Sequence, residues 1–282
     1  MEGKICIVTG SNTGIGKETA RGLAQRGATV ILACRNADKA AAAVQDIRSS
    51  TGRSDLSAET LDLASMASID AFARRIRDKY TRLDVLVNNA GIWPTQRQTT
   101  ADGLEATFGV NHVGTHMLTL RLLPLLEASA PSRVVVLSSK LHYRGVVDWE
   151  DLQMERRRFN GPTQYSNSKL MNVLFTKALA RRVAGKGVNV NAVHPGVVAT
   201  ELARNYPAFF VKIFHLFTIS PAQGAQCSLH VATSPELAEV SGEYFESSRA
   251  KRASAKALDE GAQERLWELT ESLIEARTRA AA

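Results

Sequence analysis

Cysteine is scarce in this chain, and long apolar runs are missing. The 282 residues include only Cys6, Cys34 and Cys227, at separations that suit neither a disulfide framework nor a metal site. No apolar run reaches the roughly 18 residues that a membrane-spanning helix needs. A strand-like run already begins at Ile5, so we expect neither a signal peptide nor an N-terminal anchor. These absences predict a cytoplasmic protein without a bound metal, and a peripheral membrane contact stays open.

Blocks of one charge are also rare. The net charge is +7, which could favour an anionic cofactor, a membrane surface or nucleic acid. Apart from Arg156–Arg158 the basic residues are scattered, which is typical of a solvated surface. The sequence contains no recognised nucleic-acid motif and no basic aromatic groove, so we expect no nucleic-acid partner.

Strand-like and helix-like segments alternate along the whole chain. The periodicity predicts strands over 4–10, 28–35, 57–63, 83–91, 132–139, 188–196 and 243–246. It predicts helices over 14–27, 37–51, 65–80, 102–129 with Pro124 kinking or dividing it, 163–185 and 258–277. This alternation is typical of an α/β fold, a doubly wound parallel sheet with helices on both faces. No linker or repeat divides the chain, so we expect one domain over 1–282.

Three glycines stand between the first strand and the first helix. In "IVTGSNTGIG", Gly10, Gly14 and Gly16 occupy the place of a dinucleotide-binding turn, which needs a tight bend and a close backbone approach to phosphate. The free N–H groups at the start of the helix would also favour phosphate. The alternative is a glycine-rich turn that binds nothing, and the strand–turn–helix context argues against it.

The end of the second strand bears on the choice of cofactor. Arg35 lies 19 residues beyond Gly16, and its neighbours are not acidic. An acidic residue in this place binds the ribose 2′-hydroxyl of NAD, whereas arginine suits the 2′-phosphate of NADP. We therefore predict NADP(H); the alternative is an exposed arginine in a protein that binds NAD(H).

Tyr165 and Lys169 are four residues apart on a predicted helix, so their side chains share one face. A fixed cation beside a tyrosine lowers the pKa of its phenol, which ordinarily is about 10. Such pairs also occur by chance. The position of this one, after "VVVLSS" and before "AVHPG", favours a functional pair.

Together these motifs resemble the short-chain dehydrogenase/reductase family. "TGSNTGIG" (9–16), "NNAG" (88–91), Tyr165–Lys169 and "PG" (195–196) follow the family's order over about residues 4–245. "NHVGTHMLT" (111–119) and "VNAVHPGVVATEL" (190–202) look most like its retinol-dehydrogenase-like branch. The resemblance implies a Rossmann-type fold. The long interval of 26 positions between Ser139 and Tyr165 also resembles that branch.

The resemblance implies four catalytic residues. Tyr165 would be the general acid that protonates the developing alkoxide while the cofactor donates hydride. Lys169 would lower the pKa of Tyr165 and bind the nicotinamide ribose. Ser139 would donate a hydrogen bond to the carbonyl oxygen, with Ser138 as the competing choice. Asn111 would hold a water that links Lys169 to solvent; alternatively it is a buried asparagine bonded to backbone.

The resemblance also implies a set of cofactor contacts. Asp62 and Leu63 would frame the adenine, and residues 88–91 would stabilise the sheet beside the cofactor. The nicotinamide carboxamide would be seated by Pro195, Gly196, Val198 and Thr200. The predicted NADP(H) contacts are Gly10, Ser11, Asn12, Thr13, Gly14, Ile15, Gly16, Arg35, Asp62, Leu63, Asn89, Ala90, Gly91, Tyr165, Lys169, Pro195, Gly196, Val198 and Thr200.

Substrate specificity is expected at about residues 200–223. Segment 206–221 contains four phenylalanines and Lys212 as its one formal cation, so it suits a lid over an apolar pocket. A membrane contact or a core helix would show the same pattern. His142 lies near the serines without a partner motif and reads as a loop or pocket residue. The terminal helix packs either on the body or on a second subunit of a homo-oligomer.

The predicted function is an NADP(H)-dependent oxidoreductase that interconverts a carbonyl and an alcohol. Its substrate would be apolar: retinal or retinol, or another long-chain aldehyde or ketone. Two alternatives stay open. One is a non-catalytic NADP(H)-sensing or scaffold protein on the same fold. The other is a reductase of a conjugated double bond resembling protochlorophyllide reductase.

Overall fold

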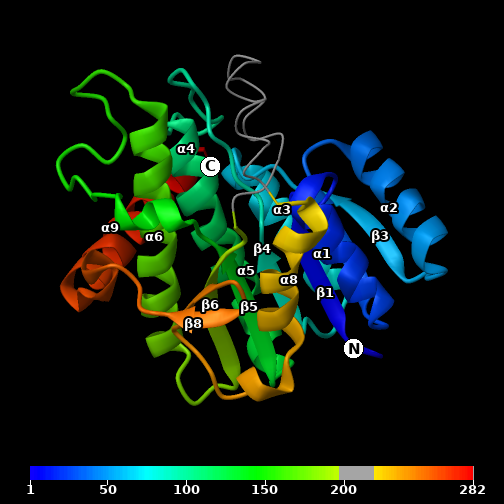
Figure 1. Cartoon of the computed structure of the whole chain (residues 1–282). Coiled ribbons are helices and arrows are strands. Elements are labelled where there is room, and N and C mark those ends of the chain that lie inside the picture. Colours follow the sequence, from blue (N-terminus) through cyan, green and yellow to red (C-terminus); the bar gives the residue numbers. More distant parts are fainter. Residues whose placement is uncertain (197–218, 282) are drawn as a thin grey trace.

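A twisted sheet of eight strands forms the centre of the protein (Figure 1). The computed structural model describes residues 1–196 and 219–281. Its strands are β1 (Ile5–Thr9), β2 (Thr29–Cys34), β3 (Leu56–Thr60), β4 (Val85–Asn88), β5 (Ser132–Leu137), β6 (Val188–His194), β7 (Tyr244–Glu246) and β8 (Arg249–Lys251). Their order is β3-β2-β1-β4-β5-β6-β7-β8, and neighbours are parallel except for β8, which is antiparallel to β7.

Helices connect the parallel strands and cover both faces of the sheet. They are α1 (Gly14–Gln25), α2 (Ala37–Thr51), α3 (Met66–Lys79), α4 (Ala106–Phe108), the π-helix η1 (Gly109–Gly114), α5 (Thr115–Ala128), α6 (Gly161–Arg182), α8 (Pro221–Thr233) and α9 (Glu260–Ala281). Short 3₁₀ turns are η2 (Lys140–Tyr143), η4 (Pro235–Leu237) and η5 (Ala255–Leu258). The predicted doubly wound α/β fold is confirmed.

Successive side chains of each strand point to opposite faces of the sheet and pack into two separate hydrophobic cores. In β1, Ile7 belongs to the core that includes residues of α3, α5, α6 and α9. Its neighbours Cys6 and Val8 belong to the core shared with α1, α2 and α8. Each fully buried leucine or phenylalanine contributes about 2 kcal/mol. Leu266 of α9 is 1% exposed, so the terminal helix packs on the body of this chain, which was one of the two arrangements left open.

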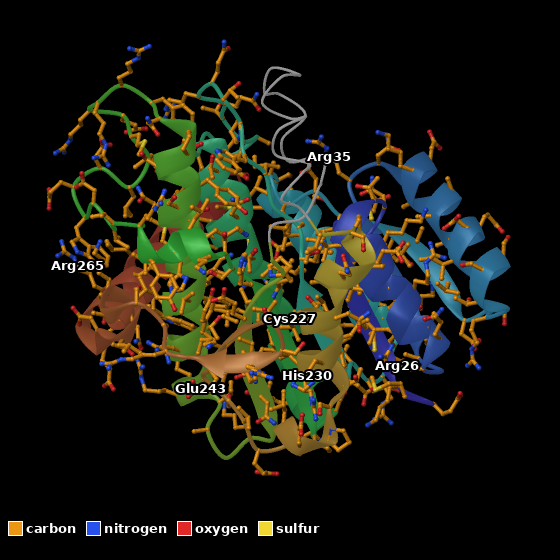
Figure 2. The ribbon with its side chains drawn as sticks, in the orientation of Figure 1. Arg26, Arg35, Cys227, His230, Glu243 and Arg265 are labelled. Atoms are coloured by element: carbon orange, nitrogen blue, oxygen red, sulfur yellow. The ribbon has the colours of Figure 1, made fainter. Side chains whose placement is uncertain are left out.

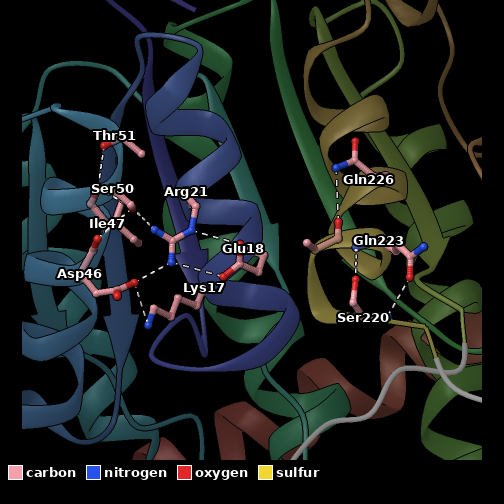
Figure 3. Close-up of polar contacts among 11 residues, drawn as sticks. Lys17, Glu18, Arg21, Asp46, Ile47, Ser50, Thr51, Ser220, Gln223 and Gln226 are labelled. Atoms are coloured by element: carbon pink, nitrogen blue, oxygen red, sulfur yellow. Dashed lines mark hydrogen bonds and ion pairs between the residues drawn. The ribbon is translucent and has the colours of Figure 1, made fainter. Parts of the chain in front are cut away.

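Helix α8 is an element that the periodicity did not reveal. Ser220 caps it in a capping box with Gln223, and Pro221 occupies its first turn (Figure 3). That signal was present in the sequence, but it lay in the stretch assigned to the lid. Figure 1 shows α1 and α8 side by side. A Cβ on Gly22 of α1 would lie 2.4 Å from the Leu229 side chain of α8, so glycine allows this close packing.

Two other expectations are corrected. The sheet has an eighth, antiparallel strand, since β7 and β8 form a hairpin around Ser247 and Ser248, whose φ angles are 51° and 59°. Left-handed turns of this kind usually contain Asn-Gly, so serines gave no signal. Pro124 does not divide the predicted helix: it lies inside α5, which continues to Ala128. The conformational change comes earlier, at the π-helix η1.

An ionic cluster joins α1 to α2 (Figure 3). Arg21 pairs with Glu18 and with Asp46, at 3.1 and 2.6 Å, and Lys17 pairs with Asp46 at 2.9 Å. Arg21 also contacts Ser50. The hydrogen bonds from Arg21 and Lys17 lower the pKa of the Asp46 carboxyl to about 2. The carboxyl of Asp46 is therefore ionised at physiological pH, and the cluster links α2 to α1. No helix in the described ranges is long and apolar enough to cross a bilayer.

Candidate active site

A cleft of about 780 Å³ opens at the carboxyl ends of β1, β2, β4 and β5. This is where parallel α/β sheets bind their ligands. Most predicted cofactor contacts line it: Gly10, Asn12, Thr13, Gly14, Ile15, Gly16, Arg35, Asp62, Leu63, Asn89, Ala90, Gly91, Tyr165, Lys169 and Pro195. Val198 and Thr200, and segment 206–221 up to residue 218, lie outside the described residues.

Each glycine of the turn has its own reason to lack a side chain. Gly10 and Gly14 have φ angles of 61° and 58°, which side chains rarely adopt. A Cβ on Gly10 would also lie 2.9 Å from the Ala90 backbone. A Cβ on Gly16 would lie 2.4 Å from Asn89 Nδ2 and 2.5 Å from the Gly10 carbonyl oxygen. The turn is thus packed tightly on the segment that follows β4.

Asn89 and Thr9 bind these two segments together. Asn89 Nδ2 donates to the carbonyls of Thr9 and Gly10, at 2.8 and 3.2 Å. Thr9 Oγ1 accepts from the backbone N–H groups of Asn89 and Ala90, at 3.0 and 2.9 Å. Asn88 Nδ2 donates to Thr119 Oγ1 of α5 at 2.8 Å. The side chains of the "NNAG" motif therefore shape the floor of the cleft, and Thr9 is a partner that the sequence analysis missed.

Ser11 and Gly196 do not line the cleft. Ser11 is fully buried, and its hydroxyl donates to the Val8 carbonyl at 2.7 Å and lies 3.6 Å from Cys34 Sγ. Its side chain therefore faces the protein interior, and only its backbone remains as a contact. Gly196 has a φ of 91°, and a Cβ there would lie 2.7 Å from Ile219.

Two cations mark one end of the cleft. Arg35 is exposed directly after β2, and Figure 2 shows its side chain at the rim of the molecule. Lys39, in the first turn of α2, lines the same cleft. Asn36 caps α2 by accepting from the Lys39 N–H at 2.8 Å. The sequence analysis missed Lys39, because its approach to the cleft depends on how α2 turns away from the end of β2.

Tyr165 and Lys169 meet in the cleft as their spacing predicts. Lys169 Nζ lies 5.4 Å from the centre of the Tyr165 ring and donates to the Leu137 carbonyl at 2.9 Å. Removal from water lowers the pKa of Lys169 to about 8 and raises the pKa of the Tyr165 phenol. The expected lowering of the tyrosine pKa is therefore not what the structure shows, because desolvation of the phenol dominates.

Asn111 lies in the π-helix η1, behind Gly91. Its Oδ1 accepts from the Ile92 N–H at 2.8 Å, and its Nδ2 donates to the Ile92 carbonyl and to Ser168 Oγ, both at 3.0 Å. A Cβ on Gly91 would lie 3.3 Å from Asn111 Oδ1 and 3.5 Å from Lys169 Nζ. Asn111 is thus bonded to backbone, as the alternative predicted, and it lies on the same side of Gly91 as Lys169 Nζ. π-Helical turns often occur at functional sites.

The two candidate serines have different partners. Ser138 lines the cleft, and its hydroxyl donates to the Lys169 carbonyl at 2.8 Å. Ser139 is half-buried and is not among the described residues that line the cleft; its Oγ accepts from the Leu141 N–H at 3.2 Å, which caps η2. Within the described hydrogen bonds the Ser139 hydroxyl acts only as an acceptor. The hydroxyl proton of Ser139 is therefore available to a further acceptor. The hydroxyl proton of Ser138 is already donated to the Lys169 carbonyl.

Comparison with known proteins identifies the family. The short chain dehydrogenase model matches residues 4–209. Human retinol dehydrogenase 13 is 47% identical over 97% of this chain and 85% of its own length. This chain belongs to the short-chain dehydrogenase family. Human retinol dehydrogenase 14, 41% identical over 97% of this chain and 87% of its own, confirms the retinol-dehydrogenase-like branch.

Solved structures of other proteins share the fold. A protein of Mycobacterium paratuberculosis is 34% identical, with a TM-score of 0.80 over 97% of this chain and 94% of its own. A short chain dehydrogenase of Escherichia coli CFT073, complexed with NADPH, is 27% identical, with a TM-score of 0.71 over 88% of this chain and 98% of its own. The fold and family of this dehydrogenase therefore rest on both sequence and structure.

His142 has a structural place in this dehydrogenase. It is fully buried; its Nδ1 lies 2.8 Å from the Ser139 carbonyl, and its Nε2 accepts from the Ser254 N–H at 3.2 Å. Because Nε2 accepts, Nδ1 carries the proton and donates to Ser139. Burial lowers the pKa of His142, so the ring stays neutral and joins the Ser139 loop to residue 254.

Trp93 is the largest feature of the site that the sequence analysis missed. It follows Ile92 directly after "NNAG", lines the cleft and stacks on the Tyr165 ring. Pro94, Gln98 and Thr99 continue the same wall. An aromatic residue placed just beyond a cofactor motif was the available signal. The sequence alone did not show that Trp93 faces the cleft, because this depends on the direction that the chain takes after β4.

Proposed function

We propose that this short-chain dehydrogenase is an NADP(H)-dependent oxidoreductase that interconverts a carbonyl and an alcohol on an apolar substrate. Retinal and retinol, or other long-chain aldehydes and ketones, are the proposed substrates. The observation that carries the proposal is that Tyr165 and Lys169 line the same cleft as the glycine turn. The names of the retinol dehydrogenases that it resembles support the substrate class.

The residues of the cleft fit a dinucleotide. The glycine turn lines the cleft at the start of α1, where backbone N–H groups favour phosphate. Arg35 and Lys39 at one end of the cleft suit the additional phosphate of NADP(H). The complex of the similar Escherichia coli protein with NADPH points the same way. When bound, the nicotinamide supplies or accepts the hydride.

The protein's own groups handle the proton. The raised pKa of Tyr165 keeps its phenol protonated at neutral pH, as a general acid for carbonyl reduction requires. Ser139 has a hydroxyl proton with which to orient the carbonyl oxygen. Lys169, with a pKa of about 8, can release or take up a proton at Nζ near neutral pH. Asn111 fixes the backbone at Ile92 beside it.

The experiment that tests this function is the Tyr165→Phe variant, assayed by NADPH oxidation with retinal. We expect turnover to fall at least a hundredfold, with NADPH binding followed by fluorescence nearly unchanged. Tyr80→Phe, at the end of α3, is the matched control. Near-normal turnover in Tyr165→Phe would remove the tyrosine from the mechanism. Wild-type protein that binds NADPH but turns over no carbonyl would favour the sensing or scaffold alternative.

Product analysis separates the remaining enzymatic alternative. A carbonyl reductase converts an enal into the allylic alcohol, whereas a double-bond reductase leaves the carbonyl and saturates the bond beside it. The ultraviolet spectrum and NMR of the product distinguish the two. We expect the allylic alcohol, because Ser139 and Tyr165 offer hydrogen-bond donors suited to a developing alkoxide.

We also propose the segment 206–221 as a lid over the apolar substrate. Phe210→Ser combined with Phe214→Ser should raise KM for long aldehydes much more than for short ones, in detergent and in liposomes alike. A variant that instead loses only its sedimentation with anionic liposomes would indicate a membrane contact. Loss of a cooperative thermal transition would place the segment in the core.

A further inference from the structure

Glu105 is a fully buried carboxylate at the start of α4. One carboxylate oxygen accepts from the Thr107 N–H at 2.8 Å. The other accepts from the Phe108 N–H at 2.8 Å and from Gln164 Nε2 at 2.9 Å. Within residues 1–196 and 219–281 no lysine or arginine pairs with it. A buried charge of this kind is costly, and here amide donors and the start of a helix stabilise it.

These contacts join the two helices that carry the proposed active site. α4 continues without interruption into η1, which carries Asn111. Gln164 is the residue before Tyr165 in α6. One carboxylate therefore holds the start of the Asn111 helix and the first turns of the Tyr165 helix at the same point. The Asn111–Ser168 hydrogen bond is a second link between them.

The long connection between Ser139 and Tyr165 also contacts Glu105 and Gln164. The Glu105 N–H donates to Gln153 Oε1 at 2.9 Å, and Gln164 Nε2 also donates to the Leu152 carbonyl at 2.9 Å. Residues 152–153 belong to the stretch that sequence analysis could describe only as an insertion. The structure shows that this stretch supports the start of the Tyr165 helix.

We propose that Glu105 and Gln164 are positioning residues for the reaction: their hydrogen bond fixes the Tyr165 helix relative to the Asn111 helix. The inference rests on the proposed function of Tyr165. Misplacement of a reacting group by about 1 Å can cost a hundredfold in rate. A link next to Tyr165 should therefore affect turnover more than it affects cofactor binding, to which the glycine turn, Arg35 and Lys39 also contribute.

Gln164→Met removes the Nε2 donor and keeps the length of the side chain, and Glu105 still caps α4. We expect kcat with retinal to fall about tenfold, with NADPH binding by fluorescence within twofold of wild type. Thr176→Val is the control on the same helix. It removes a buried hydrogen bond to the Asn172 carbonyl, and kcat should stay within twofold.

Gln164→Glu tests the contact through pH. Two carboxylates in contact can share one proton, so the new side chain donates to Glu105 only when it is protonated. We expect kcat relative to wild type to recover at least threefold between pH 8 and pH 6. A purely structural effect on folding would leave that ratio flat in protein whose thermal transition is cooperative at both pH values.

The outcomes separate this inference from the proposed function. If Tyr165→Phe is inactive while Gln164→Met retains kcat within twofold, the positioning role is wrong and the function stands. Equal losses of kcat in Gln164→Met and Thr176→Val also overturn it. If Gln164→Met does not fold, the test is the kcat of Gln164→Glu relative to wild type at pH 6 and pH 8. An equal ratio at the two pH values refutes the positioning role. Near-normal turnover of Tyr165→Phe refutes the function itself.

Discussion

The indole of Trp93 lies flat against the phenol ring of Tyr165, with ring centroids 4.6 Å apart and planes inclined by 10°. Stacked aromatic pairs of this kind contribute about 0.5–1.5 kcal/mol beyond the area they bury. Lys169 Nζ lies 5.4 Å from the centre of the same phenol ring, within the range of a cation–π contact. The orientation of Tyr165 thus depends on an aromatic neighbour from outside its own helix.

Trp93→Leu should therefore lower kcat with retinal by roughly three- to tenfold, the equivalent of one lost stacking contact. NADPH affinity should change little. Trp149→Leu is the matched control, because Trp149 is also half-buried but contacts Arg265, whose guanidinium lies 4.7 Å from its ring centre. Steady-state kinetics of both variants check the prediction. Equal effects on kcat would show that Trp93 contributes only to stability.

The cations at the rim of the cleft should select the cofactor. Arg35→Ala and Lys39→Ala should each weaken NADPH binding about tenfold, the loss of one exposed charge-assisted contact. NADH binding should change less than twofold, because NADH has no 2′-phosphate. Arg74→Ala, which removes an exposed cation of α3, is the control. Equal losses for both cofactors, or a wild type that prefers NADH, would contradict the assignment.

Local patterns predicted the parts of the site that depend on short stretches of chain. The strand–turn–helix around Gly10 and the four-residue spacing of Tyr165 and Lys169 are fixed by one turn or one helix. The order of apolar runs was enough for the parallel sheet. The structure places these residues where the sequence predicts them, in one cleft.

The missed features depend on contacts between distant segments or on side-chain direction. Ser11 belongs to the glycine turn, yet its hydroxyl points to Val8, a direction that the motif does not encode. Glu105 meets Gln164 only through the packing of α4 on α6. The pKa of Tyr165 depends on how much water the fold removes from the phenol, and that burial raises it.

The glycine turn gives a sharp test of packing. Gly16→Ala places a Cβ 2.4 Å from Asn89 Nδ2 and 2.5 Å from the Gly10 carbonyl oxygen, so the turn and the "NNAG" segment must separate. We expect at least a tenfold loss of NADPH affinity by fluorescence titration. Gly52→Ala is the control: Gly52 has a φ of 67° and nothing within 4 Å of an added Cβ, so it should cost only about 1 kcal/mol of stability. Normal affinity in Gly16→Ala would show that the turn can relax.

The buried ammonium of Lys169 sets a pH dependence of stability. Lys169 is 3% exposed, and burial lowers its pKa from 10.5 to about 8. Below pH 8 both the folded and the unfolded chain carry the proton, and the folded state bears the cost of a buried charge. Between pH 8 and 10.5 the unfolded chain holds a proton that the folded chain has released, so this group makes stability rise with pH.

Lys169→Met removes that titration. We therefore expect the free energy of unfolding of the wild type, minus that of the variant, to increase by about 3 kcal/mol between pH 8 and pH 10.5. Denaturant unfolding at several pH values measures the difference, in which titrations common to both proteins cancel. Lys177→Met is the reference variant. It removes another lysine of α6 that donates to a backbone carbonyl, that of Gly242, as Lys169 donates to that of Leu137. A difference that stays constant or decreases across this window would mean that Lys169 is solvated in the folded protein. The exchange of a proton at Nζ near neutral pH would then lose its physical basis.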